Sequence, residues 1–392
     1  MKWEVKKLRD VCEIVTDTPP EYDGEKDYFS TGAISNDEFD LPEKVTYKER
    51  PSRANSYPKT GDVGFAKMKF TNKVLLINSK LNGSIFSTGF CFLRPNNSLD
   101  YRYLFQFIIS HSFQKLKDLY ASDGIMGGIK NSDVRQIEIP VPPLSEQKRI
   151  VALLDKALES IAKAKENAEK NLKNAKKVFE SYLQKVFENK GEEWEEKKLE
   201  EICTKITDGV HKKPKYVSEG IPFIKINNLT DGPKISFKNV SYITKKDHEL
   251  FCKRTKPEKG DILITKDGTI GIIKVIDTDI EFSIFVSVAL IKPLSKEITS
   301  YLKYVLMSPI IQNQIKPKGT ALKHLYLKDL RNYMIPIAPL SEQMKIVFKL
   351  DELYTKTQAL DDIYNQKFKV LEELKQSILQ KAFKGELTEA SA

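Results

Sequence analysis

Residues 139–147 read IPVPPLSEQ, and residues 335–343 repeat them as IPIAPLSEQ. In both places, prolines that cannot lie inside a helix are followed by a serine and a glutamate, which are typical of a helix start. We therefore predict that a long helix begins here twice, with Ser145 and Ser341 as the N-cap residues.

The whole 392-residue chain follows this repeat from end to end. WEVKKL at 3–8 returns as WEEKKL at 194–199, and SYLQK at 181–185 returns as SILQK at 377–381. In each half, a part with frequent glycine, proline and β-branched residues precedes a part rich in Lys, Glu, Ala, Leu and Gln. The chain is therefore one plan used twice.

These differences in local composition predict an α+β fold made of four segments. Residues 1–143 and 191–339 are expected to form two similar mixed α/β domains. Residues 144–190 and 340–392 are expected to supply one long spacer helix each. The two helices should pair as an antiparallel coiled coil between the domains, which gives the chain an internal pseudo-two-fold repeat.

The pairing is predicted from apolar residues that recur every three or four positions. The seam of the first helix is Ile150, Leu154, Ala157, Ile161, Ala164, Ala168, Asn171, Ala175, Val178 and Tyr182. The seam of the second helix is Ile346, Leu350, Leu353, Thr357, Leu360, Tyr364, Lys367, Leu371, Leu374 and Ile378. An alanine-rich seam and a seam of large residues complement each other in volume, so the pair is expected to form within one chain.

Size decides the direction of pairing. Each helix is about 65 Å long, whereas a domain of the size between them has a radius of gyration of only about 15 Å. Parallel helices would force the two ends of that domain apart by a full helix length, so we expect them to be antiparallel. The expected register opposes Ala157 to Leu371, Ala164 to Tyr364, Ala168 to Leu360 and Ala175 to Leu353.

Composition narrows the function classes. Hydrophobic residues make up 40% of the chain, no apolar run is long enough to cross a membrane, and the first residues lack the apolar core of a signal peptide. We expect a cytoplasmic protein with no membrane partner. Cys12, Cys91, Cys203 and Cys252 lie far apart, which predicts reduced thiols and no zinc site. The net charge of +10 favours a polyanionic partner.

The motifs of enzymes are missing from the sequence. It contains no phosphate-binding loop, no dinucleotide-binding glycine fingerprint and no Asn-Pro-Pro-aromatic motif of adenine methyltransferases, and its four histidines are too scattered for a metal cluster. We expect no catalytic residue, no metal and no cofactor on this chain.

The repeated helix entries at 143–147 and 339–343 resemble those of the specificity subunit of type I restriction-modification systems. Further resemblance lies in TDGVHKKP at 207–214, in GTIG at 268–271 and in GTA at 319–321. The first half departs from this pattern, because DTPP at 17–20 replaces the Asp-Gly-x-His stretch. Such divergence between the halves is what the reading of two different half-sites requires.

The resemblance implies a non-catalytic, sequence-specific DNA-binding subunit. Each domain would be a target recognition domain that reads one half of a bipartite double-stranded DNA site, and the helices would set the spacing. It implies two methyltransferase (M) subunits docked on the helices, with S-adenosylmethionine bound to them, and translocase-nuclease (R) subunits as further partners.

Local charge indicates where DNA would bind. Residues 1–143 carry a net charge of +1 and residues 191–339 carry +6, but nine basic residues gather between 44 and 80. Lysine and arginine suit phosphate and guanine, and asparagine suits adenine. The candidates in the first domain are Lys44, Lys48, Arg50, Arg53, Asn55, Lys67, Lys69, Asn72 and Lys73. Those in the second domain are His211, Lys212, Lys213, Lys215, Lys225, Asn227, Asn228, Lys245, Lys246, Lys253, Arg254, Lys266, Thr269 and Thr320.

Two other readings remain open from the residues. The chain can be a non-enzymatic scaffold that spaces two protein-binding modules, in which case DNA affinity that falls with salt is not expected. It can also be an enzyme, such as a nuclease, whose active site has no familiar motif. Incubation of the chain alone with DNA, magnesium and S-adenosylmethionine separates these readings.

Overall fold

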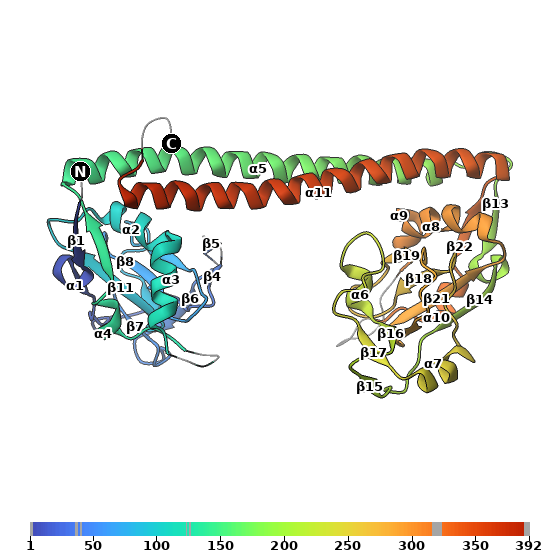
Figure 1. Ribbon diagram of the computed structural model, residues 1–392, viewed down its shortest axis with the longest axis horizontal. Coiled ribbons are helices and arrows are strands. Elements are labelled where there is room, and N and C mark those ends of the chain that lie inside the picture. Colours follow the sequence, from blue (N-terminus) through green and yellow to red (C-terminus); the bar gives the residue numbers. More distant parts are fainter. Residues whose placement is uncertain are drawn as a thin grey trace. The chain divides into compact units, whose positions relative to one another are not determined.

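The computed structural model of the protein describes residues 3–35, 38–39, 41–122, 124, 127–315 and 324–387. The chain forms two compact units (Figure 1). Unit 1 comprises Met1–Ala168 and Gln366–Ala392, and unit 2 comprises Glu169–Asn365. Each unit contains parts of three of the four expected segments, because each of the two long helices is shared between the units. The expected segment boundaries therefore stay predictions.

Unit 1 combines a two-stranded sheet, β1-β12, with two four-stranded sheets of order β2-β11-β8-β9 and β6-β3-β10-β7, and a small β4-β5 pair. Its strands are β1 (Glu4–Lys7), β2 (Cys12–Ile14), β3 (Glu25–Phe29), β4 (Ile34–Ser35), β5 (Glu38–Phe39), β6 (Glu43–Thr46), β7 (Ala54–Ser56), β8 (Val63–Ala66), β9 (Val74–Leu76), β10 (Ile85–Ser87), β11 (Phe90–Pro95) and β12 (Glu138–Val141). Its short helices are α1 (Leu8–Val11), α2 (Tyr101–Ile109), α3 (His111–Tyr120) and α4 (Asn131–Val134).

Unit 2 repeats the order of two of these sheets, as β13-β22 and β14-β21-β18-β19. Its third sheet has the order β15-β17-β16-β20, in which the outer strand β15 pairs with β17, whereas β7 of unit 1 pairs with β10 at the opposite edge. Its strands are β13 (Glu195–Lys198), β14 (Cys203–Asp208), β15 (Tyr216–Val217), β16 (Ile221–Ile224), β17 (Ser241–Ile243), β18 (Ile262–Thr265), β19 (Ile273–Val275), β20 (Ser283–Ile284), β21 (Val288–Pro293) and β22 (Met334–Ile337). Its short helices are the 3₁₀ helices η1 (Leu199–Ile202) and η2 (Lys296–Ile298), and α6 (Ile226–Thr230), α7 (Lys245–Cys252), α8 (Thr299–Met307), α9 (Pro309–Gln312) and α10 (Leu327–Arg331).

The central strands are the most apolar ones. All four residues of β8 and of β18 are buried, as expected for strands covered on both faces. Gly64 in β8 lies under an aromatic ring, since a Cβ atom there would come within 2.4 Å of the Phe92 side chain. These buried strands form the rigid base from which the loops of the candidate site extend.

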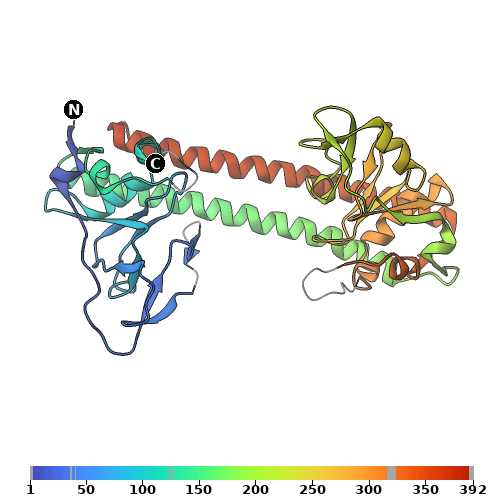
Figure 2. The same ribbon diagram turned by 90° about the horizontal axis from the view of Figure 1, so that it is seen from below.

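The two predicted long helices are confirmed as α5 (Leu144–Glu188) and α11 (Leu340–Lys384). Within unit 1 the beginning of α5 and the end of α11 share one core, and within unit 2 the end of α5 shares a core with the beginning of α11. Figure 2 shows the two helices side by side, running in opposite directions. The expectation of antiparallel pairing is therefore confirmed.

The start of each long helix differs from the prediction. The carbonyl oxygen of Pro143 accepts hydrogen bonds from the amides of Glu146 (2.9 Å) and Gln147 (3.0 Å), so Pro143 rather than Ser145 is the N-cap residue. Pro339 plays the same part in α11, in place of Ser341. The N–H that proline lacks has no partner at an N-cap, so each helix can begin directly after its proline, two residues earlier than predicted.

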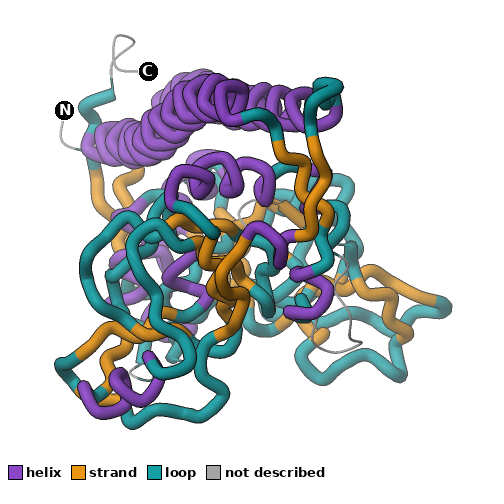
Figure 3. The backbone as a smooth tube through the Cα atoms, turned by 90° about the vertical axis from the view of Figure 1, so that its right-hand side faces the viewer, coloured by secondary structure: helices purple, strands orange, loops and turns teal. Residues whose placement is uncertain are grey.

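The repeated glutamine of the entry motif connects α5 to its domain. Buried Gln147 donates to the carbonyl oxygens of Ser98 (2.9 Å) and Pro142 (2.8 Å) and accepts from the amide of Asp100 (2.8 Å). In unit 2 the buried Gln343 donates to the preceding Ala338 carbonyl (2.7 Å). The β1-β12 and β13-β22 ladders lie next to these helix starts, and Figure 3 shows the paired strands leading from the helices into unit 2.

The predicted seam is correct at its start and wrong in its middle. Ile150, Leu154, Ala157 and Ala168 are buried, but Asn171 and Val178 are exposed. Their places are taken by Leu172 and Phe179, and in α11 by Phe368 and Lys375 in place of Lys367 and Leu374. A straight α-helix has 3.6 residues per turn, so a strict seven-residue pattern drifts off the contact face and four-residue steps restore it.

The predicted register is also wrong in unit 2. It would place Phe179 opposite Lys349 and Lys176 opposite Glu352. Instead, the Phe179 ring centre lies 5.6 Å from that of Tyr354, and Lys176 Nζ forms a 2.5 Å ion pair with Asp361. The difference in register follows from the different seam, because Phe179 rather than Val178 packs against α11.

Aromatic contacts join the long helices to the sheets in the same way in both units. In unit 1 the ring of Tyr103 in α2 lies 5.2 Å from Phe383 in α11. In unit 2 the ring of Tyr301 in α8 lies 5.8 Å from Phe187 in α5. Within the described residues, no helix has the length and hydrophobicity to span a bilayer.

The four cysteines are free thiols. Burial raises the pKa of Cys12, Cys91 and Cys203 to about 12, so these side chains are core residues with little thiolate character.

Candidate nucleic-acid interface

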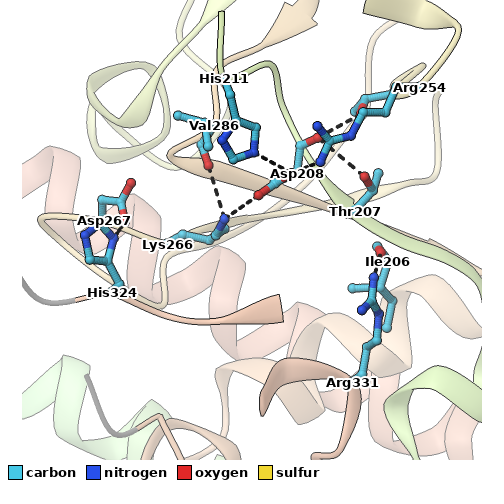
Figure 4. A network of polar contacts seen from close by, with 11 residues as sticks. Ile206, Thr207, Asp208, His211, Arg254, Lys266, Asp267, Val286, His324 and Arg331 are labelled. Carbon is cyan, nitrogen blue, oxygen red and sulfur yellow. Dashed lines mark hydrogen bonds and ion pairs between the residues drawn. The ribbon is translucent and has the colours of Figure 1, made fainter. Parts of the chain in front are cut away.

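Asp208 is the centre of the polar network in unit 2. It ends β14, and its side chain is only 5% exposed. Arg254 Nη2 lies 2.6 Å from one carboxylate oxygen, and Lys266 Nζ lies 2.6 Å from the other. His211 Nε2 approaches the first oxygen at 3.4 Å, and Figure 4 shows the three side chains converging on the carboxylate. Because a buried carboxylate needs hydrogen-bonded cations, Asp208 fixes where these groups lie.

Two side chains from other elements donate hydrogen bonds to carbonyl oxygens of the strand that carries Asp208. The Thr255 hydroxyl donates to the carbonyl oxygen of Asp208 (2.8 Å). Arg331 Nη2 donates to the carbonyl oxygen of Ile206 on the same strand (2.9 Å), as Figure 4 shows. Side chains from other elements therefore hold the strand that carries Asp208 in place.

The chain leaves this network through a position that only glycine can occupy. A Cβ atom on Gly209 would lie 2.1 Å from the carbonyl oxygen of Ile284 in β20. The next amide, of Val210, donates to that same carbonyl oxygen (3.1 Å). This close approach determines where the basic loop that starts at His211 emerges.

The second element of the site is the β18–β19 loop, residues 266–272. The amide of Lys266 donates to the carbonyl oxygen of Ser287 (2.8 Å), and its own carbonyl oxygen accepts from the amide of Leu325 (2.9 Å). The Asp267 carboxylate and His324 Nδ1 are hydrogen-bonded to each other beside it. Thr269 is exposed in the middle of this loop, and the sequence had predicted it as a polar loop position.

Most predicted DNA contacts of unit 2 do lie on its surface. The exposed ones are His211, Lys212, Lys213, Lys215, Asn227, Lys245, Lys246, Lys253, Arg254 and Thr269. The amide of Lys215 donates to the Asp247 carboxylate (3.2 Å), which joins the loop after β14 to α7. Lys266 and Arg254 together outweigh the charge of Asp208, so the network and the loop around it favour an anionic partner.

Four predicted residues of unit 2 are placed differently or not at all. Lys266 is one of them, because its side chain is buried and held by Asp208 rather than exposed to a ligand. Asn228 is buried, accepts from the Lys225 amide (2.9 Å) and donates to the Ser236 carbonyl (3.0 Å), so its amide group supports α6 instead of facing a ligand. Lys225 is half-buried, with Nζ 3.0 Å from Ser241 Oγ and 4.5 Å from the Tyr216 ring centre. Thr320 lies outside the described residues.

Unit 1 has a related network with different partners. Arg94 in β11 donates to both oxygens of buried Asp62 (2.8 and 2.7 Å) and to Asp17 (3.1 Å). Asp17 is the counterpart of Asp208 in the repeat. The hydrogen bonds with Asp62 raise the pKa of Arg94 above its ordinary value. In unit 2, Lys292 and Asp261 form the corresponding ion pair at 2.6 Å.

The predicted basic residues of unit 1 divide into two groups. Those of the first group do not line the cavity described below, and two of them are engaged by the chain itself. Lys44 on β6 pairs with Asp27 (2.6 Å), and half-buried Arg50 lies 4.1 Å over the Tyr47 ring and donates to the Ala54 carbonyl. Lys48 is exposed in the turn after β6, and Asn55 is half-buried in β7.

The second group surrounds a cavity of about 510 Å³. Arg53, Lys67 and Lys73 line it together with threonine and glycine residues. Lys73 Nζ donates to the carbonyl oxygen of Thr31 (2.6 Å), and Arg53 is exposed at the cavity. The described residues that line the hollow include three cations and no carboxylate, a lining that suits a phosphate or a base edge.

The β8–β9 loop, residues 67–73, is built like the β18–β19 loop of unit 2. Lys67 donates its amide to the Gly89 carbonyl (2.9 Å) and accepts from the Ile129 amide (3.0 Å), the same pattern as Lys266. Met68 bridges to Gly128 as Asp267 bridges to His324. The loop also carries Lys69 and exposed Asn72, so the two units present one backbone framework with different side chains.

The sequence prediction missed the residues that hold these surfaces in place. Asp208, Asp17 and Arg94 were not among the candidates, and neither was Lys117, which is fully buried beneath the β8–β9 loop. The recurrence of an aspartate at equivalent positions of both halves was a usable signal for Asp17 and Asp208. Lys117 gave none, because a lysine on an amphipathic helix is normally a solvated charge.

Within the described residues, no group of three or more His, Cys, Asp or Glu side chains has an arrangement that could hold a metal ion.

Comparison with known proteins is consistent with this duplicated arrangement. The family described as the type I restriction modification DNA specificity domain matches residues 1–172 and again 191–372. A curated relative, the type I restriction enzyme EcoBI specificity subunit of Escherichia coli, is 31% identical over 278 residues. That match covers 64% of this chain and 58% of the relative.

Two solved structures match nearly the whole chain. One is described with the complex assembly and conformational transition of the type I R-M system; its TM-score is 0.77, with 26% identity and 98% of each chain covered. The other is the HsdS subunit from Thermoanaerobacter tengcongensis, with a TM-score of 0.51, 26% identity, and coverage of 98% of this chain and 97% of that one.

Proposed function

Since this chain belongs to the type I restriction-modification DNA specificity family, we propose that it is the DNA-recognition subunit of such a system. Each copy of the specificity domain reads one half of a bipartite double-stranded target, and the paired helices set the spacing between the halves. The observation that carries this proposal is the duplicated loop framework. Lys67 and Lys266 make equivalent backbone hydrogen bonds, and Met68 and Asp267 make equivalent bridges. The side chains that the two loops offer to DNA nevertheless differ, as Lys67-Met68-Lys69-Phe70 against Lys266-Asp267-Gly268-Thr269.

We further propose that the chain itself catalyses nothing and needs no cofactor. Its exposed cations neutralise phosphates and read base edges, and S-adenosylmethionine belongs to the partner methyltransferase subunits. Incubation of the purified chain with DNA, magnesium and S-adenosylmethionine should give neither cleavage nor methylation. Either product would contradict this part of the proposal.

The methyltransferase subunits, two per complex, are proposed to dock on the long helices, and translocase-nuclease subunits to join for cleavage. At the start of α11, Leu340, Met344 and Phe348 form an exposed apolar stripe, with Phe348 75% exposed. Residues four apart lie on one helix face, and an apolar face of this kind is typical of a protein contact. Phe348→Asp should abolish co-purification with a methyltransferase subunit, whereas Glu352→Gln, one turn further along, should not.

The decisive experiment is co-expression with type I methyltransferase subunits from the same genome, followed by sequencing of methylated adenines. We expect a single bipartite sequence with a nonspecific spacer. Exchange of residues 44–80 for those of a relative should then change one half-site only. A contiguous target, or a change in the other half-site, would overturn the assignment.

DNA binding has its own test. Affinity for a duplex that carries the methylated sequence should fall steeply as salt rises, because cations that contact phosphates release counterions. The slope of log affinity against log salt changes by about 1 for each phosphate contact that is lost. If both lysines contact phosphate, Lys212→Gln combined with Lys213→Gln should therefore reduce the steepness of this slope by about 2. Affinity that does not depend on salt would favour the scaffold reading.

A further inference from the structure

Phe70 is the most unusual side chain on the surface of unit 1. Its ring is 80% exposed, and its backbone has a φ of +59°. Among described residues other than glycine, only Phe70 and Asn239 have a positive φ. Asparagine tolerates this left-handed conformation, whereas for a bulky residue it costs about 1 to 2 kcal/mol. The exposed ring adds nothing to the hydrophobic core, so neither the ring nor the strained backbone beneath it stabilises the fold.

The strained conformation is imposed by contacts from below. The amide of Phe70 donates to the Asp118 carboxylate of α3 (3.0 Å). The fully buried Lys117 donates to the carbonyl oxygens of Thr71 (2.5 Å) and Met68 (3.3 Å), on either side of Phe70. These bonds hold the loop from both sides, so the ring projects from a rigid base and loses little entropy when it binds.

The surroundings of the ring point to its partner. Lys67, Lys69 and Lys73 belong to the same seven-residue loop, and Lys69 Nζ lies 5.6 Å from the ring centre. The cavity lined by Arg53 adjoins the loop. An apolar ring framed by cations matches a base stack, which presents apolar faces between two lines of phosphates.

We infer that Phe70 inserts between neighbouring bases of the half-site read by unit 1, unstacks them, and thereby adds a dependence on DNA deformability to the readout. This inference rests on the proposed DNA-recognition function. The corresponding residue of unit 2 is Thr269, which has no ring to insert, so the wedge belongs to one half-site only. Pyrimidine–purine steps unstack most easily and are the expected sequence at the insertion point.

The test uses the complex with methyltransferase subunits and duplexes in which 2-aminopurine, whose fluorescence rises on unstacking, replaces single adenines. The wild-type complex should raise the fluorescence at one step of the first half-site. Phe70→Ala should remove that rise and weaken binding about tenfold, without changing the salt slope, because the ring contacts no phosphate. Phe70→Leu, which keeps an apolar wedge, should retain part of both effects.

Leu119→Ala is the matched control, since Leu119 is another strongly exposed apolar side chain of unit 1 outside the loop (74% exposed) and should leave affinity and fluorescence unchanged. If the complex binds its target with normal salt dependence but no step gains fluorescence, the wedge is wrong and DNA recognition stands. If Phe70→Ala instead impairs only the co-purification of a partner subunit, the ring is a protein contact. If the wild-type complex shows no salt-dependent binding to DNA at all, both proposals are wrong.

Discussion

At Asp208, one buried carboxylate holds two cations, and its removal should be costly. Asp208→Asn keeps the shape of the side chain but leaves Lys266, which is itself buried, without its counter-charge. Removal of one partner of a buried pair typically costs several kcal/mol, so we expect a loss of about 3 kcal/mol in the free energy of unfolding. Urea denaturation of the two proteins measures this difference.

The control for that substitution is Asp277→Asn. Asp277 pairs with Lys234 on an exposed surface, where an ion pair contributes little. Its removal should leave the urea midpoint nearly unchanged. Equal effects of the two substitutions would mean that Asp208 does not organise the site.

Lys117 gives a prediction with a defined dependence on pH. Burial lowers its pKa below the ordinary value of 10.5, so between the two pKa values the unfolded chain binds more protons than the folded chain. Stability therefore rises with pH over that interval. The free energy of unfolding of the wild type, relative to that of Lys117→Met, should increase as pH is raised through the folded pKa towards 10.5. A constant or falling difference in urea titrations would contradict a lowered pKa of the buried Lys117.

At the scale of the helix, neighbouring residues of α5 separate the observed seam from the expected one. Phe179 is 7% exposed and contacts Tyr354, whereas Val178 is 61% exposed. Phe179→Ala should lower the free energy of unfolding by about 3 kcal/mol through the cavity it leaves. Val178→Ala should change it by less than about 0.5 kcal/mol. Thermal unfolding of both variants measures the two losses. A larger loss for Val178→Ala than for Phe179→Ala would support the strict heptad pattern instead.

At the scale of the whole molecule, the prediction concerns the length of the two long helices. Both α5 and α11 are continuous, and each belongs to both units. Deletion of one heptad from each, residues 165–171 and 361–367, should shorten the nonspecific spacer of the DNA target. Both half-sites should stay the same, since the recognition loops are untouched. Sequencing of methylated adenines reads all three quantities at once, and a spacer of unchanged length would refute the role of the helices as a ruler.

The sequence was sufficient for the features that depend on local pattern and repetition. The duplicated entry motif and the seams predicted two long helices, and the relative sizes of helix and domain predicted their antiparallel direction. Clustered lysines predicted the basic loops, because residues that are close together in the sequence stay close together in space when one loop carries them. The sequence did not predict the N-caps, since Pro143 and Ser145 both suit a helix start and only the hydrogen bonds distinguish them.

By itself, then, the sequence determined the two-fold plan, the long helices and the basic stretches, because each of these follows from the periodicity or composition of contiguous residues. Only the tertiary structure decided the seam beyond Ala168, the register of the helices and the groups that hold the recognition loops. The contacts of Asp208 with Arg254 and of Lys117 with Thr71, next to Phe70, each join residues 46 positions apart. Such contacts arise from the packing of strands and helices, and no local pattern encodes which buried charge will meet which partner.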